Sequence, residues 1–195
     1  MFKKIHLILR TLTLIPHMIV FKCSKNYKTI CADLDRWRRL CPKGETASSL
    51  YMFLYTMTFF KEFRNLFYMR VGKIEYLIKF LCRPLDSLYL VSKNIGPGFY
   101  IEHGFSTFLA FHSMGSNCMV NQQVTIGFTE KGKPTIGNNV NIRAGAKVIG
   151  DITIGNNVTI GAGAVIVKDV PSDCVVVGSR AYIVRKNGEK VREEL

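Results

Sequence analysis

The sequence is poor in the residues that most often carry metal, redox and nucleophile chemistry. Its 195 residues include only four histidines, and none of the six cysteines stands in a CxxC pair. The cysteine spacings suit neither a zinc site nor a compact disulfide framework, so we expect reduced thiols, a cytoplasmic setting and no bound metal. A Ser-centred nucleophile motif and a GxxxxGK[ST] phosphate loop are also missing.

Long apolar runs are missing as well. Residues 2–22 begin like a signal peptide, but His6, Arg10, Pro16 and His17 interrupt the stretch, and no small-residue cleavage site follows. A membrane-spanning helix needs about 20 mostly apolar residues. The stretch therefore predicts a helix packed on its own domain, with a basic helix lying on a membrane surface as the alternative.

Acidic residues are scarce in the first half of the chain. Residues 1–94 carry 17 basic and 6 acidic residues, which is +11 of the total +13, whereas residues 95–195 carry 10 and 8. This asymmetry indicates an anionic partner such as a membrane surface or a phosphorylated substrate, or simply a solvated basic face. We expect no nucleic-acid partner, because no recognition element for one is visible.

Residues 1–93 are predicted to form a helical domain. Pro16 should limit a first helix, a second should span about 26–40, and a third should be capped near Ser48 and run unbroken to Gly72. A fourth apolar stretch ends before Pro84. Aromatic residues recur at helical spacing in the third stretch, which is more typical of a core than of a binding surface.

What is abundant is a repeat. Aliphatic residues recur every six positions, and Gly and Asn-Asn follow in phase at 137–139 and 155–157; the aliphatic positions are Ile136, Ile142, Val148, Ile154, Ile160 and Ile166. A period of six fits neither a helix nor a flat strand, but it suits a coil that turns a corner every six residues. We predict a parallel β-helix over 94–184, a loop projecting near 128–135, and a tail at 185–195.

The repeat slips once, and both histidines of the second half lie at the slip. Ile101 and Met114 are thirteen positions apart, one more than two hexads, so one residue should bulge out within 103–113. His103 and His112 lie there, and a neutral imidazole can accept a proton near neutral pH. Glu102 precedes His103, and it can orient the ring only if the backbone turns between them.

Small residues accompany cations further along the repeat. The runs AGA at 144–146 and GAGA at 161–164 would let a thin, extended ligand lie against the backbone. Basic side chains nearby could meet phosphate groups; these are Lys131, Lys133, Arg143, Lys147 and Lys168.

These motifs together resemble the serine acetyltransferase branch of the left-handed β-helix acyltransferases. The likeness rests on the hexapeptide array, IGPGFYIEHG, NCMVNQQVTIG and IGAGAVIVKDVP, and it covers about residues 60–184. Within that branch the sequence is most similar to bacterial polysaccharide O-acetyltransferases. The resemblance implies a mainly β fold, a left-handed parallel β-helix of hexapeptide repeats with an N-terminal α-helical domain. It also implies acetyl-coenzyme A as co-substrate and a homotrimer, or a higher assembly, with active sites between subunits.

The resemblance also assigns roles to residues. His103 becomes the catalytic base, Glu102 the acidic residue before it, and Ala144 and Ala162 mark positions near the coenzyme A groove, with Lys168 near its pantetheine or phosphates. We add Arg143 and Lys133 as further coenzyme A contacts. Our candidates for binding the acceptor are His112, Arg70 and Gln122.

Three groups of the serine acetyltransferases have no match here. In that family an acidic residue precedes the first hexad, but the corresponding stretch here, SLYLVSKNIG, has none. The family's Arg-His pair is missing from the loop FTEKGKP. Its Asp-Pro pair has no match either, and the nearest pair is Cys41-Pro42. Because a free amino acid then has few partners, we expect a sugar hydroxyl of a capsular or surface polysaccharide, or its precursor, as the acceptor. Serine O-acetylation for cysteine synthesis is the alternative, and a non-catalytic scaffold is the third. A lipid-linked sugar would place the basic half at the inner membrane face.

Overall fold

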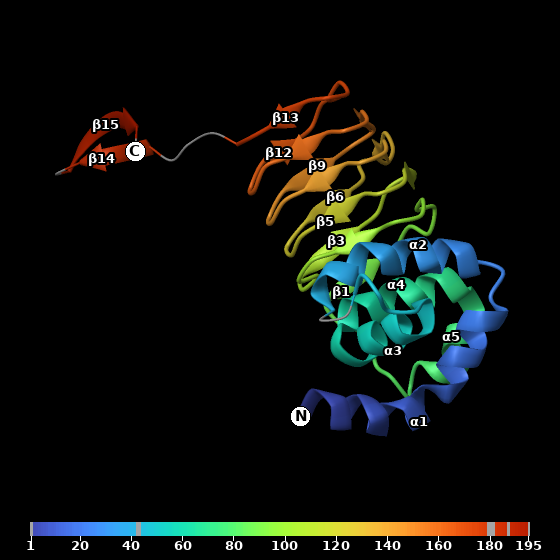
Figure 1. The fold of residues 1–195 in the computed structure, drawn as a ribbon. Helices are drawn as coiled ribbons and strands as arrows, with labels where there is room; N and C mark the ends of the chain where they lie inside the picture. The colour runs from blue at the N-terminus through green and yellow to red at the C-terminus, as the bar shows by residue number, and fades with distance from the viewer. Residues whose placement is uncertain (1, 42–43, 179–181, 187, 195) are drawn as a thin grey trace.

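The computed structural model describes residues 2–41, 44–178, 182–186 and 188–194. Helices gather at one end of a stack of β-coils (Figure 1). The helices are Phe2–Cys23 (α1), Tyr27–Trp37 (α2), Ser49–Phe59 (α3), Lys61–Val71 (α4) and Glu75–Ile78 (α5), with 3-10 turns at Arg38–Leu40 (η1) and Gly72–Ile74 (η2).

The coils build a solenoid of short parallel strands, one face to a sheet. The first face holds Leu88–Leu90 (β1), Thr107–Leu109 (β3), Thr125–Gly127 (β6), Lys147–Ile149 (β9) and Val165–Ile166 (β12). The second holds Ser113–Met114 (β4), Thr135–Ile136 (β7) and Thr153–Ile154 (β10). The third holds Tyr100–Ile101 (β2), Met119–Val120 (β5), Asn141–Ile142 (β8), Thr159–Ile160 (β11) and Val175–Val176 (β13).

The hexad pattern explains this stack. Ile142 lies over Ile160, and Ile136 over Ile154, so each aliphatic residue meets its equivalent one coil away and both are buried. Burial of such side chains stabilises the stack by roughly 25 cal/mol per Å² of apolar surface removed from water. The predicted parallel β-helix of hexapeptide repeats with an N-terminal helical region is confirmed.

Asparagine side chains make ladders along one corner of the solenoid. Asn139 and Asn157 hold left-handed backbone angles, φ 56° and 57°, which Asn tolerates better than most residues. Their side chains form one ladder, since Asn139 donates to Asn157 at 2.9 Å and Asn157 donates to Asp173 at 2.8 Å. The recurring Asn-Asn pairs thus serve the corners structurally.

The helical region differs from the prediction in two places. α1 continues through Pro16 instead of ending there, because one missing backbone donor is tolerated in a helix of 22 residues packed on α3. The predicted third helix is two helices, since Phe60 is extended with φ −122° and ψ 105°. Arg64 stabilises the break by donating to the carbonyls of Met57 and Thr58, both at 2.8 Å.

A buried ion pair joins the helices to the first coil. Arg70 on α4 contacts Asp33 on α2 with N–O distances of 2.8 and 3.2 Å. Arg70 also donates to the carbonyl of Ile95 at 2.5 Å and to that of Gly96 at 2.7 Å, and Asp33 accepts from the amide of Phe99 at 2.9 Å. The solenoid is therefore fixed to α2 and α4 by charged groups withdrawn from water.

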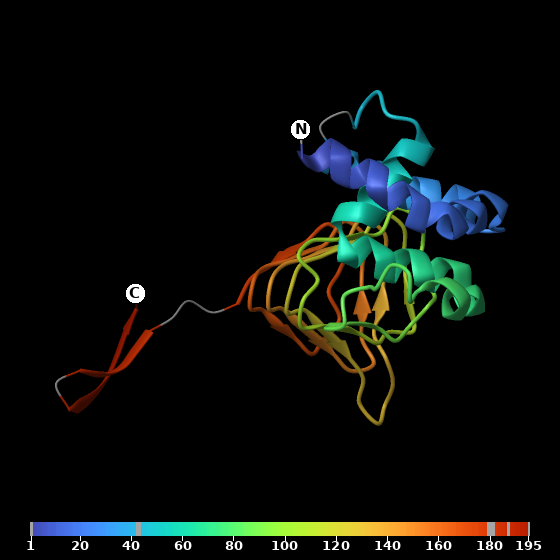
Figure 2. The same ribbon diagram turned by 90° about the horizontal axis from the view of Figure 1, so that it is seen from below.

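The chain ends in an antiparallel pair, Tyr182–Lys186 (β14) with Glu189–Glu194 (β15), so residues predicted as a tail form a strand. The loop between β6 and β7 projects from the solenoid (Figure 2). Among the helices of the described residues, none is long and apolar enough to cross a membrane.

Candidate active site

His103 lies in a two-residue insertion at one corner of the solenoid. Ile101 and Leu109 are eight positions apart, whereas the equivalent pair in the next coil, Val120 and Ile126, are six apart. The following corner compensates, because Leu109 and Met114 are five apart. The single extra residue predicted for 103–113 is thus two residues gained at 103–104 and one lost later.

The insertion is held in an unusual backbone shape. His103 has φ 58°, a left-handed value, and its carbonyl accepts from the amide of Phe105. Gly104 next to it is buried, and a Cβ there would lie 3.1 Å from Glu62 and from Leu88. The helices and β1 therefore press on the base of the insertion while the imidazole of His103 is exposed.

Most of the other predicted site residues share this corner. Along it the amide of one coil donates to a carbonyl of the coil before: Gln123 to Phe105, Gly145 to Gln122, and Gly163 to Ala144, all at 2.9–3.0 Å. Glu102 aligns in the same way with Asn121, Arg143 and Gly161. The corner thus brings together Glu102, His103, Gln122, Arg143, Ala144 and Ala162.

The carboxylate of Glu102 is held by two neighbours that sequence reasoning missed. Asn121 donates its side-chain amide to Glu102 at 2.8 Å, and the guanidinium of Arg39 lies 3.8 Å from the other carboxylate oxygen. Arg39 comes from η1 and lies over the ring of Tyr100, 4.4 Å from the ring centroid. Burial raises the pKa of Tyr100, and Arg39 partly offsets that rise.

A separate corner holds the remaining predicted ligand contacts. The amide of His112 donates to Pro134 at 2.8 Å, Lys133 lies in the projecting loop, and Lys168 follows β12 on the same side. The strand β3, about 10 Å long, separates this corner from that of His103. Within one chain, His112, Lys133 and Lys168 do not converge with His103.

Arg70 does not join either corner. Its side chain is 6% exposed and is occupied by Asp33 and two backbone carbonyls, so it has no group free for an acceptor. The sequence does not distinguish a buried arginine from a ligand-binding one, because the partner of Arg70, Asp33, lies 37 positions away in the chain.

Grooves accompany the two corners. One of about 570 Å³ lies three coils further along the corner of His103 and is lined by Gly161–Ile166 and Val176–Gly178, with Ala162 exposed along it. Another of about 560 Å³ lies at the projecting loop, lined by Thr129–Lys131 and Ile149–Ile152 with Val167. The small residues of the GAGA run thus line a channel along the backbone.

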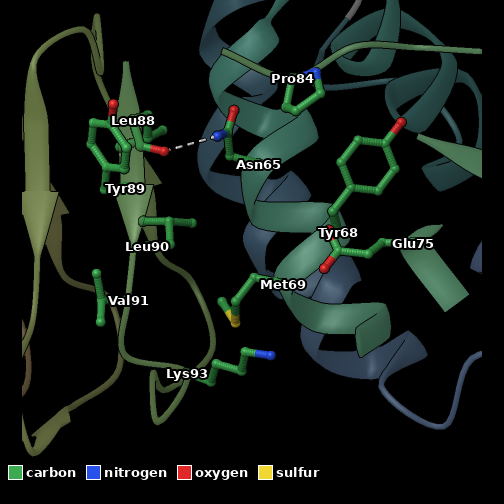
Figure 3. Close-up of a pocket in the computed structure, with 10 residues that line it drawn as sticks. All are labelled: Asn65, Tyr68, Met69, Glu75, Pro84, Leu88, Tyr89, Leu90, Val91 and Lys93. Carbon is green, nitrogen blue, oxygen red and sulfur yellow. Dashed lines mark hydrogen bonds between the residues drawn. The ribbon is translucent and has the colours of Figure 1, made fainter. Parts of the chain in front are cut away.

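A further hollow separates α4 from β1 (Figure 3). It has about 290 Å³, and Asn65 at its edge donates to the carbonyls of Leu85 and Leu88 at 3.0 and 3.2 Å. None of the predicted site residues lines it. In the described part of the chain, groups of three or more His, Cys, Asp or Glu that could hold a metal ion do not occur.

Comparison with known proteins identifies the repeat. Residues 133–168 match the family described as bacterial transferase hexapeptide (six repeats). A serine acetyltransferase of Synechococcus elongatus is 41% identical over 132 residues, which cover 65% of this chain and 54% of the relative. One from Staphylococcus aureus is 44% identical over 103 residues, covering 50% and 48%. The chain therefore spans about half the length of the curated relatives it matches.

Solved structures show the same likeness. The serine acetyltransferase of Neisseria gonorrhoeae in complex with serine is 27% identical with a TM-score of 0.58, covering 87% of this chain and 70% of that one. Isoform 3 from Entamoeba histolytica, in complex with cysteine, is 30% identical with a TM-score of 0.52, covering 83% and 63%.

These relatives correct one prediction. We expected a sugar hydroxyl as the acceptor, because groups that bind serine were missing from the sequence, but the relatives and the solved structures are serine acetyltransferases. The missing groups were sought at fixed places in the sequence, whereas the fold brings Arg39 to Glu102 from 63 positions away. The solenoid carries the hexapeptide repeats of bacterial transferases, and the chain is similar, over the part it shares, to serine acetyltransferases.

Proposed function

We propose that this chain is an O-acetyltransferase that moves the acetyl group of acetyl-coenzyme A to the hydroxyl of serine. One observation carries the proposal: an exposed imidazole, His103, is held out of the solenoid by a two-residue insertion, at a corner whose later coils form a groove lined by small residues. The similarity to serine acetyltransferases supports the acceptor.

In this proposal His103 acts as the general base. Its unprotonated ring nitrogen takes the proton of the serine hydroxyl as the oxygen attacks the thioester carbonyl carbon. The carbonyl oxygen gains the negative charge until the C–S bond breaks, and the imidazolium then returns the proton to the departing thiolate. Atoms and charge balance without a covalent bond to the protein.

The groove three coils along the corner from His103 fits the extended arm of coenzyme A. Ala144 and Ala162 have side chains too short to block a ligand that lies along the backbone, and Gly163 adds none. Arg143 is exposed at the same corner and can meet a phosphate group. Gln122, beside Phe105 in the next coil, is the candidate contact for the acceptor.

The second corner takes part only through another copy of the chain. His112, Lys133 and Lys168 are separated from His103 by a full face of the solenoid, so a homotrimer with sites between subunits would bring them to it. Besides catalysis, the basic helical region could touch an anionic membrane surface, since α1 exposes Leu12, Ile15 and Ile19 near Lys22 and Lys25.

A single substitution tests the role of His103. His103→Asn suits the test because Asn tolerates φ 58° but cannot act as a base near neutral pH. General-base catalysis contributes about 10²–10⁴ in rate, so kcat for thiol release with L-serine should fall at least 100-fold. Binding of coenzyme A, measured by calorimetry, should remain.

His112→Asn is the companion variant, because it changes the exposed imidazole at the second corner, whose proposed role is in binding and not in proton transfer. If His112→Asn abolishes turnover and His103→Asn does not, the base has been assigned to the wrong ring. Thiol release with nucleotide sugars or capsular oligosaccharides but none with L-serine would contradict the acceptor.

A further inference from the structure

The geometry points to Arg39 as the residue that selects an acceptor carrying a carboxylate. This inference rests on the proposed function and deepens it, since it names the group that reads the amino-acid part of serine. It concerns substrate binding, so Arg39 is expected to act on affinity for the acceptor and not on proton transfer.

The position of Arg39 is fixed by contacts of the two residues that precede it in the chain. Trp37, 1% exposed, packs edge-on against Tyr100 at 4.9 Å and anchors the end of α2 on β2. Arg38 donates to the carbonyls of Gly44 and Ala47, both at 2.7 Å, which ties η1 to the loop after it. With these two residues anchored, the guanidinium of Arg39 extends over Tyr100 toward Glu102.

The guanidinium of Arg39 is held in position, but its hydrogen-bond donors are not all occupied. Its nearest carboxylate oxygen, on Glu102, is 3.8 Å away, beyond hydrogen-bond distance, while Asn121 occupies the other oxygen at 2.8 Å. The ring face of Tyr100 fixes the plane of the group, and the Tyr100 hydroxyl can occupy one of its five N–H donors. The Arg39 side chain is 57% exposed, so a ligand can reach those donors.

The charges of this site are the complement of an amino acid. Arg39 is positive and Glu102 negative, they lie 3.8 Å apart, and His103 follows Glu102 directly. An α-carboxylate can accept two parallel hydrogen bonds from the guanidinium, while the α-ammonium can meet Glu102. The short side chain of serine would then hold its hydroxyl close to both groups, one residue from His103.

Arg143 at the same corner is the competing cation. It is aligned with Glu102 but lies two coils further along, about 10 Å away at the spacing of stacked strands. A carboxylate bound there would lie far from the insertion that carries His103. Arg143 therefore suits a phosphate of the donor, and Arg39 the acceptor.

The experiment compares two acceptors in steady-state kinetics, L-serine and L-serinamide, which lacks the carboxylate. Arg39→Ala should raise the KM for L-serine about 10- to 100-fold, as for loss of a charge-assisted bidentate contact, and Arg39→Lys should restore part of it. The KM for L-serinamide and that for acetyl-coenzyme A should stay within about twofold. Arg143→Ala removes the same charge and should raise the KM for acetyl-coenzyme A instead.

Each other outcome overturns the inference in a recognisable way. An unchanged KM for L-serine in Arg39→Ala shows that Arg39 does not bind the acceptor, although the enzyme acetylates serine. Equal losses with L-serine and L-serinamide, with a lowered melting temperature, show that Arg39 only supports the fold. If the unaltered protein neither acetylates L-serine nor binds it in calorimetry, the proposed function fails, and this inference with it.

Discussion

The solenoid and the helical region solve the problem of buried polar groups in different ways. In the solenoid, asparagine side chains lie at an exposed corner and repeat from coil to coil, as the Asn139 and Asn157 ladder shows. In the helical region, charged or titratable groups are buried, among them Asp33, Arg70 and His17. The repeat therefore distributes its stability over many similar contacts, whereas the helices concentrate it in a few buried polar contacts.

Among the substitutions considered, loss of Asp33 should lower the free energy of unfolding most, because it removes one partner of a buried ion pair. Asp33→Ala leaves Arg70 buried without its carboxylate, and removing one partner of a buried pair costs about 3–5 kcal/mol. Asp35→Ala is the matched control two positions away, where an exposed pair with Arg38 contributes less than about 1 kcal/mol. Urea denaturation measures both, and equal losses would contradict the difference we draw.

Acid should affect the helical region next, through His17. Burial, helped by Arg10 and Arg64, lowers the pKa of His17 from 6.5 to about 4. The folded state therefore binds this proton less readily than the unfolded chain does. The stability His17 contributes is complete above pH 6.5 and is lost as the pH falls toward 4, by about 3 kcal/mol.

The tautomer of His17 suggests the variant. Tyr68 donates its hydroxyl to the carbonyl of Cys82 at 2.6 Å, so its oxygen must accept from Nε2–H of His17 at 2.8 Å. His17→Gln keeps a donor for that oxygen but does not titrate. Urea midpoints measured from pH 7 to pH 4 should fall less steeply in His17→Gln than in His112→Gln, an exposed control. Parallel pH profiles would show that His17 is not the group responsible.

Substitution at a corner of the solenoid should lower the free energy of unfolding least, because equivalent contacts in the neighbouring coils remain. Asn157→Gly keeps the backbone angle of 57° but removes the amide bonds to Asn139 and Asp173, for a cost of about 1 kcal/mol. Asn157→Ala adds left-handed strain of about 1 kcal/mol more. Thermal melts of the two variants separate the loss of the ladder hydrogen bonds from the cost of backbone strain. If Asn157→Ala is more stable than Asn157→Gly, the assignment of strain is refuted.

Prediction from sequence succeeded where the pattern is local. The hexad and its slip located the solenoid and the insertion at His103, because each coil repeats the contacts of the one before. Ser48 does cap α3, accepting from the amide of Tyr51, and Gly72 does end α4 with φ 67°. The break at Phe60 was missed, since it depends on Arg64 turning back onto α3.

The sequence pattern indicated which predicted site residues share one corner, but it did not indicate which arginine lies beside them. Glu102, His103, Gln122, Arg143, Ala144 and Ala162 align because the coil spacing fixes them. Arg70 is buried against Asp33 and Arg39 was not among the candidates, since no local signal tells a buried arginine from an exposed one. Both depend on how α2 and α4 pack against β2 and the first coil.

The sequence by itself determined the repeat, the corner residues and the place where an imidazole leaves the array, because a six-residue period dictates which side chains point inward. Only the tertiary structure decided which arginine is buried, which one meets Glu102, and which predicted residues lie on another corner. Those outcomes depend on contacts between segments far apart in the chain, where the free energy of burying a charge is set by its partner and not by its neighbours in sequence.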